Sequence, residues 1–179
     1  MHRYLRVCAA VVASAALGCG SKGGKGAPDG APSDGREAVC AGDRWGASAE
    51  MLEAIVGCTI ITGNLSITGN QLVSAELPLL TRVDGFLSVW GNPVLTRVTF
   101  AKLASVGGYL DVSANVALTS LEMPALKNVN ERAVPAAHDV VIRDNALPTC
   151  RAEAIREQLA ASGFRGTVSI SGNGSACPL

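Results

Sequence analysis

The sequence predicts an all-β fold, a short right-handed parallel β-helix (a solenoid) of about five rungs, with small helical, disulfide-bonded caps. Three observations support this prediction. A phrase of eight residues recurs five times, the segments between its copies share their apolar spacing, and two pairs of cysteines bracket the repeated region. Repeats of roughly 20–50 residues are typical of solenoids, because a single unit is too small to bury its own core and must stack on the next.

The repeated phrase predicts one short strand for each rung. Its copies are GNLSITGN at 63–70, GFLSVWGN at 85–92, GYLDVSAN at 108–115, HDVVIRDN at 138–145 and GTVSISGN at 166–173. Apolar residues alternate with mostly small polar ones, which is typical of a strand with one buried face. The inward positions are Leu65, Ile67, Leu87, Val89, Leu110, Val112, Val140, Ile142, Val168 and Ile170. The closing Asn favours a turn with positive φ or a side-chain-capped bend, so we expect five Asn in a ladder along one edge.

The segments between the strands repeat as well. Apolar residues follow Asn92 and Asn115 at the same offsets of 3, 6, 11 and 14, and the run after Asn70 is one residue shorter. Each unit is therefore predicted to be a coil with three apolar sides, and the stacked coils are expected to cover about residues 58–173.

The ends of an open solenoid expose unpaired strand edges, so caps are expected there. Residues 48–56 predict a short amphipathic helix with Ser48 as its N-cap. Residues 151–161 predict a second helix, with Ile155 and Leu159 on one face and Gly163 beyond its end. Each predicted helix lies beside a cysteine pair, and capping is the role expected of both.

The chain has six cysteines, of which Cys8 and Cys19 lie near the N-terminus. The others are Cys40, Cys58, Cys150 and Cys177. In an exported protein four cysteines indicate two disulfides, for which three pairings exist. We expect Cys40–Cys58 and Cys150–Cys177, because a long rod would hold Cys58 and Cys150 apart. A metal or redox site is disfavoured, since the chain has no CxxC and one histidine, His138, after the first 18 residues.

The first 18 residues are predicted to be a signal peptide, a basic segment followed by an apolar stretch too short to span a membrane. The stretch ends at Ala16-Leu17-Gly18-Cys19, which resembles the bacterial lipoprotein signal, although that family prefers Leu where this chain has Ala16. The resemblance implies acylation of Cys19; an ordinary signal with an incidental cysteine is the alternative. Residues 19–39, rich in Gly, Pro, Ser and Ala, are then the anchor cysteine and a disordered tether.

These features predict an exported protein, lipid-anchored to the bacterial cell envelope, with the membrane as a partner of its N-terminus. By the sorting rules of bacterial lipoproteins, Gly20 after the anchor favours the outer membrane. Whether the protein faces the periplasm or the exterior stays open.

Residues 40–179 resemble the receptor L-domain family, the β-helical ligand-binding domains of insulin- and epidermal-growth-factor-type receptors. The resemblance rests on the GxLxVxxN rungs, on the LPxLxxVxG-like spacer at 77–85, and on Asn145-Ala-Leu-Pro-Thr-Cys150, which looks like the segment that opens the family's C-terminal disulfide cap. It implies binding rather than catalysis and assigns no ligand residues. A leucine-rich repeat is the competing fold, but Val106 stands four residues before Leu110, where that consensus needs three.

Catalysis, cofactors and nucleic acid find no support in the sequence. No HExxH, GxSxG or P-loop phrase occurs. The formal net charge is zero and there is no basic stripe of the kind that nucleic-acid binding needs. We therefore expect a protein that is not an enzyme and that uses no cofactor and no metal.

The outward side of the repeated strand is the candidate binding face. Its distinctive residues are Phe86, Trp90, Tyr109, Asp111 and Arg143, and Phe86 and Tyr109 are expected to share one column. Exposed aromatic side chains on a rigid sheet are typical anchors for a protein or glycan partner. The alternative is that the rings shield the sheet or pack under the insertion 131–138. Two functions stay open: a recognition module, and a structural envelope spacer without a discrete ligand.

Overall fold

The computed structural model describes residues 37–46, 48–130, 139–175 and 177. The predicted signal peptide, Cys19, nearly all of the tether and the insertion 131–138 lie outside these residues. No helix in the described part of the chain is long and apolar enough to cross a membrane.

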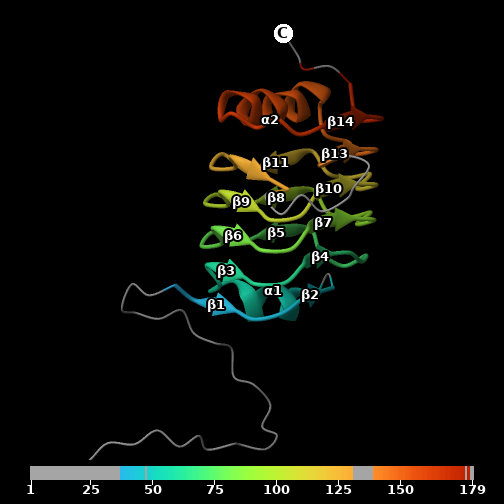
Figure 1. The fold of residues 1–179 in the computed structure, drawn as a ribbon. Coiled ribbons are helices and arrows are strands. Elements are labelled where there is room, and N and C mark those ends of the chain that lie inside the picture. Colours follow the sequence, from blue (N-terminus) through green and yellow to red (C-terminus); the bar gives the residue numbers. More distant parts are fainter. Residues whose placement is uncertain (1–36, 47, 131–138, 176, 178–179) are drawn as a thin grey trace, which may run out of the picture.

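The chain winds into a parallel β-solenoid of about four turns, with its strands stacked in three sheets (Figure 1). Three complete turns carry three strands each: β3 (Ile60–Ile61), β4 (Leu65–Ile67) and β5 (Ser74–Glu76); β6 (Arg82–Val83), β7 (Leu87–Trp90) and β8 (Arg97–Thr99); β9 (Ser105–Val106), β10 (Leu110–Ser113) and β11 (Ser120–Glu122). Before them come β1 (Val39–Cys40), β2 (Arg44–Trp45) and α1 (Ala49–Ile55), and after them β12 (Asn128–Val129), β13 (Val140–Arg143), α2 (Thr149–Ala161) and β14 (Val168–Ser171). The predicted all-β helical fold is confirmed.

The five copies of the phrase form neighbouring strands of one sheet, whose order is β14-β13-β10-β7-β4-β2. Their register is the one that the alignment of the copies predicts, with Leu110 opposite Leu87 on one side and Val140 on the other. From β4 to β13 every inward residue of this sheet is fully buried, whereas Val168 and Ile170 in the terminal strand are only partly so. The core is thus a continuous column of Leu, Val and Ile along the solenoid axis.

A helix takes the place of the third strand in the first and last turns. The helix α1 follows β2, and α2 follows β13, just as β5, β8 and β11 follow the other strands of the long sheet (Figure 1). The Ser48 hydroxyl accepts from the Met51 backbone N–H at 3.2 Å, which confirms the predicted N-cap. The second helix begins two residues earlier than predicted, at Thr149, and Gly163 follows it with φ +89°.

Both disulfides connect the predicted partners. Cys40 pairs with Cys58 and Cys150 with Cys177, each with a Cα–Cα distance of 5.8 Å. Each bridge lies beside a terminal helix, so each end of the solenoid is cross-linked by a disulfide.

The Asn residues that close the phrases form a ladder inside the solenoid, and not at its edge as expected. The side-chain amides of Asn92, Asn115 and Asn145 each donate to the side-chain oxygen of the Asn one turn further, at 2.9–3.0 Å, and the row ends at Asn173. Positive φ occurs one residue earlier in each of these four corners, as at Ala114 with φ 54°. Each of these corners therefore combines the two expected features, a residue with positive φ and an Asn side chain that caps the bend.

The first copy leaves this ladder. Asn70 is exposed, and the ladder contains four residues rather than five. Ile67 and Ser74 are seven positions apart, whereas their strand partners Val89 and Arg97 are eight apart, so this corner is one residue shorter. The buried Oδ1 of Asn92, at the end of the row nearest Asn70, has no hydrogen-bond partner among the described residues.

Candidate binding surface

The long sheet positions all five predicted face residues on neighbouring strands. Phe86 and Tyr109 immediately precede β7 and β10, whose register aligns them in one column. Trp90 and Arg143 end β7 and β13, and they share a second column in which Ser113 lies between them. The structure thus brings Phe86 and Tyr109 into contact, but it separates Trp90 from Arg143 by one strand.

Three aromatic rings form an aromatic column, which we define as Trp45, Phe86 and Tyr109. The rings of Phe86 and Tyr109 are stacked, with centroids 4.9 Å apart and planes 8° from parallel. Trp45 meets Phe86 edge to face, with centroids 5.9 Å apart and an interplanar angle of 81°. Both arrangements are favoured by aromatic quadrupoles. The column therefore spans the long sheet from β2 to β10.

A hydrogen bond from the Phe86 backbone to a side chain of the preceding turn holds the middle residue of the column in place. The Asn64 side-chain oxygen accepts from the Phe86 backbone N–H at 3.0 Å, which holds the start of β7 against the turn below. A Cβ on Gly85 would collide with that same oxygen, so only glycine fits between the two turns. The close approach of the two turns thus explains the glycine at the start of this copy of the phrase, and this close approach helps to position Phe86.

The column and Trp90 are partly open to solvent. Trp45 is 58% exposed and Trp90 is 53% exposed, whereas Phe86 and Tyr109 are half-buried. Sequence reasoning missed Trp45, because its strand β2 has two residues and lacks the repeated phrase. Trp45 can be recognised from the strand pairing: it lies opposite Ser66, an outward-facing residue of β4, and so faces outward on the same sheet.

Polar groups beside the rings lack partners. Oδ1 of Asp111 and Oγ of Ser113 are buried and accept or donate no hydrogen bond. Burial raises the pKa of the Tyr109 phenol, and the nearby Asp111 carboxylate raises this pKa further. Arg143 is exposed, with its Nε 4.0 Å from Oδ2 of Asp144. The face therefore combines aromatic surface with a buried carboxylate oxygen that makes no hydrogen bond within the described ranges.

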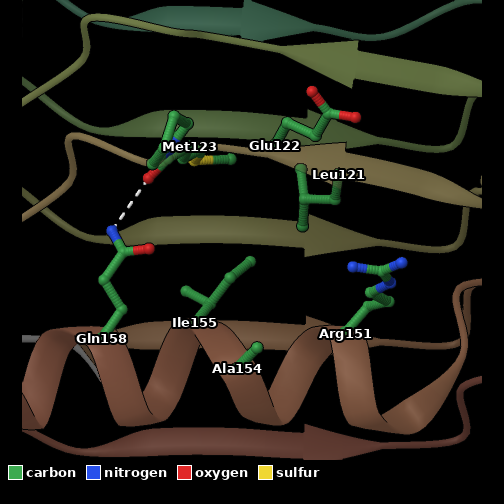
Figure 2. A pocket seen from close by; sticks show the side chains of 8 residues that line it. Leu121, Glu122, Met123, Arg151, Ala154, Ile155 and Gln158 are labelled. Atoms are coloured by element: carbon green, nitrogen blue, oxygen red, sulfur yellow. Dashed lines mark hydrogen bonds between the residues drawn. The ribbon is translucent and has the colours of Figure 1, made fainter. Parts of the chain in front are cut away.

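A second surface lies between β11 and α2, where a hollow of about 210 Å³ opens (Figure 2). Gln158 closes one end by donating to the backbone oxygens of Met123 and Leu126, at 2.9 and 2.7 Å. At the other end of this hollow, Leu121 projects from β11 and Arg151 from α2, with space between them. A smaller hollow, lined in part by the same two residues, lies next to it. A hollow of about 450 Å³ occupies the equivalent place between α1 and β5. These hollows are gaps left where a helix replaces a strand.

No cluster of three or more His, Cys, Asp or Glu side chains that could hold a metal ion occurs in the described ranges. His138 falls outside them. Since the hollows are accounted for by helix packing, the aromatic column with Asp111 is the strongest candidate for a binding surface.

The sequence profile named Receptor L domain matches residues 57–160 of this chain. No solved structure matches the chain. The matched region holds the three complete turns and most of the last one, and its three parallel sheets agree with a β-helix rather than with the leucine-rich repeat considered above. Domains of this type are ligand-binding modules. The profile covers more than half of the chain, which therefore belongs to the receptor L domain family.

Proposed function

We propose that this protein is a non-catalytic recognition module, tethered to the bacterial cell envelope through Cys19, that binds a protein partner through the aromatic column and Trp90. The observation that carries the proposal is the stack of Phe86 on Tyr109, extended by Trp45, on the outward side of the long sheet. Large rings held on a rigid sheet lose little conformational entropy on binding, and Trp and Tyr dominate the energetics of protein interfaces.

The ring geometry favours a protein over a glycan. A sugar stacks best on an aromatic face that is open to solvent, but Phe86 and Tyr109 stack on each other, and Phe86 also makes an edge-to-face contact with Trp45. Rings that already pack on one another offer a compact apolar surface, which suits aliphatic and aromatic side chains of a protein. Glycan binding remains the alternative ligand class.

Capture from envelope extract tests the proposal. Replacing Phe86, Trp90 and Tyr109 together by Ala should abolish capture, because truncating an interface anchor costs about 2 kcal/mol or more. The fold should persist, since the inward Leu87 and Leu110 stay in place and are fully buried. Each captured protein is then purified and its binding measured directly.

A matched control removes apolar surface elsewhere. Val73, Val94 and Val116 are 60%, 42% and 68% exposed, and their joint replacement by Ala should leave capture unchanged. If wild type and the aromatic triple variant retain the same partners, the aromatic surface is not the site.

A structural spacer is the second candidate, favoured by the small polar residues that fill the rest of the same sheet face. Ser66, Ser88, Ser169 and Ser171 offer little to anchor a partner. If wild type captures nothing under any of several salt and detergent conditions, the spacer function replaces the recognition function.

The lipid anchor is a separate part of the proposal. Metabolic labelling with a fatty-acid probe should mark the wild-type protein and leave Cys19→Ala unlabelled. Equal labelling of the two forms would reject acylation at this cysteine without affecting the binding proposal.

A further inference from the structure

The strand β14 is an unpaired edge of the long sheet, at the C-terminal end of the solenoid (Figure 1). Among the described residues only β13 pairs with it. With four residues it is longer than the other edge strands of the three sheets, which have two or three. The upper edge of the third sheet, at β11, is covered by α2, because Gln158 donates to the backbone oxygens of Met123 and Leu126. Within the described ranges no hydrogen bond covers the free side of β14 in this way.

The hydrogen bonds of the earlier turns show which backbone groups this edge leaves open. The first N–H of each strand in the long sheet donates to the next turn, as Val140 does to the Thr167 backbone oxygen at 3.0 Å. Val168 has the equivalent position in β14, opposite Val140. Its N–H therefore points to where a further turn would lie, and strand alternation directs the N–H and C=O of Ile170 to the same side. Another strand can add to the sheet through these groups.

The side chains of β14 do nothing to prevent such an addition. Exposed edges of monomeric proteins commonly carry Lys, Pro or a bulge that discourages pairing. Residues 166–172, Gly-Thr-Val-Ser-Ile-Ser-Gly, contain no charge and no Pro. The inward Val168 and Ile170 are only partly buried, whereas their counterparts from β4 to β13 are fully buried. An added strand with apolar residues at its inward positions would complete their burial.

We propose that β14 pairs with β14 of a second copy of this chain, antiparallel and about a two-fold axis at Ser169. A two-fold contact closes both free edges at once, because each strand is the partner of the other. In this register Val168 lies opposite Ile170 of the second copy, and the two residues exchange N–H···O bonds through the groups that point outward from the edge. The apolar faces of the two long sheets then join into one.

The charges beside the edge favour a second copy as the occupant. Arg165 is exposed and makes no ion pair in the described ranges. Asp144 is exposed at the other end of β14, where it packs against Gly172, and the Nε of Arg143 lies 4.0 Å from it. The antiparallel register puts Arg165 of one copy two strand spacings from Asp144 of the other, roughly 10 Å between backbones, a gap that the two side chains can span. By symmetry this complementary pair forms twice.

The pairing leaves the aromatic column open, because the column ends at β10 and β13 lies between β10 and β14. A dimer would therefore present two aromatic columns on one continuous sheet, and a partner with two binding sites would gain avidity. The pairing itself does not depend on the proposed recognition function, so either can fail while the other stands.

Cysteine cross-linking of the purified full chain tests the pairing and its register. Ser169→Cys puts two thiols at the centre of the contact, where residues directly opposite lie about 4.5 Å apart and a disulfide can form. Ser171→Cys is the matched control, because it lies opposite Thr167 of the second copy and its own two thiols are more than about 10 Å apart. Mild oxidation should give a covalent dimer of Ser169→Cys and none of Ser171→Cys. A mixture of Ser171→Cys and Thr167→Cys should cross-link.

Sedimentation equilibrium measures the pairing without a cross-link. Wild type should show a monomer–dimer equilibrium. Arg165→Glu should weaken it about tenfold, because two complementary pairs become two like-charge pairs. Arg151→Glu reverses an exposed charge on α2 and should leave it unchanged. Circular dichroism of each variant checks that the fold is kept.

Four results would overturn the proposal. They are a wild type that stays monomeric at every concentration, equal cross-linking of Ser169→Cys and Ser171→Cys, and equal effects of Arg165→Glu and Arg151→Glu. The fourth is a series of oligomers that keeps growing with concentration, which would indicate head-to-tail stacking of β14 on β2 of the next copy. If Ser169→Cys cross-links in cells to another protein and not to itself, the occupant is a foreign strand and the second copy is excluded.

Discussion

Asn92 donates from its side-chain amide to the side-chain oxygen of Asn115, 2.9 Å away on the next turn. The same amide also donates to the Ile67 backbone oxygen, on the turn before, at 3.0 Å. One buried side chain thus connects three successive turns. Because Asn115 makes the equivalent bonds to Val89 and Asn145, the ladder resists the sliding of one turn over another.

Replacing Asn115 by Ala should destabilise the protein by about 3 kcal/mol, because the backbone N–H of Asn92 loses its acceptor and the side-chain bonds to Asn92 and Asn145 are lost in the buried interior. Urea unfolding followed by circular dichroism measures the change. Asn70→Ala is the matched control, since Asn70 closes the same phrase but is exposed, and it should change stability by less than about 0.5 kcal/mol. Equal effects of the two substitutions would contradict a ladder role.

Gly85→Ala should destabilise the fold by about 2 kcal/mol, because the new methyl group collides with the Asn64 side-chain oxygen. Shortening that neighbour to Ala should relieve part of the collision. In a double-mutant cycle, Gly85→Ala should therefore cost less in the Asn64→Ala background than in wild type. Additive effects would show that the two turns do not meet at these residues.

Tyr109 offers a pH test. Burial and the Asp111 carboxylate raise its pKa above the ordinary value of 10.0, so folding favours the neutral phenol. This contribution to stability is fully present below pH 10 and is lost as the pH rises through the raised value. The difference in tyrosinate absorbance between wild type and Tyr109→Phe isolates this residue, since the other tyrosine of the sequence, Tyr4, lies in the predicted signal peptide.

The midpoint of that difference titration should lie above 10.0 in wild type. Asp111→Asn should lower it but leave it above the ordinary value, because burial is the larger cause. A midpoint that does not respond to Asp111→Asn would place the carboxylate too far from the phenol to act on it.

Much of the fold could be predicted from the sequence. The alternation of apolar and polar residues predicts the strands, and the shared offsets of the spacers predict turns of nearly equal length. The stack of Phe86 on Tyr109 could be predicted for the same reason, since aligned copies of a phrase become aligned strands. Both cysteine pairs follow from their places at the two ends.

Other features depend on contacts that no local pattern records. The inward direction of Asn115 becomes evident only when an amide on the next turn is in reach, whereas turn statistics treat Asn as a residue for positive φ. Trp45 belongs to the aromatic column although its strand, β2, has an Arg at the inward position and no phrase around it. The unsatisfied oxygen of Asp111 likewise depends on what the neighbouring strands fail to donate.

Site-specific photo-crosslinking in living cells tests the central claim, that the partner binds the aromatic side of the long sheet. A photoreactive residue is placed at Ser88, which lies on that side of β7, or at Thr99, which lies on the third sheet in the same turn. The two positions share one rung of the solenoid and differ only in the face on which they project. A cross-linked protein adduct from position 88 and none from position 99 is the predicted result; an adduct from position 99 alone, or equal adducts from both, would contradict the claim.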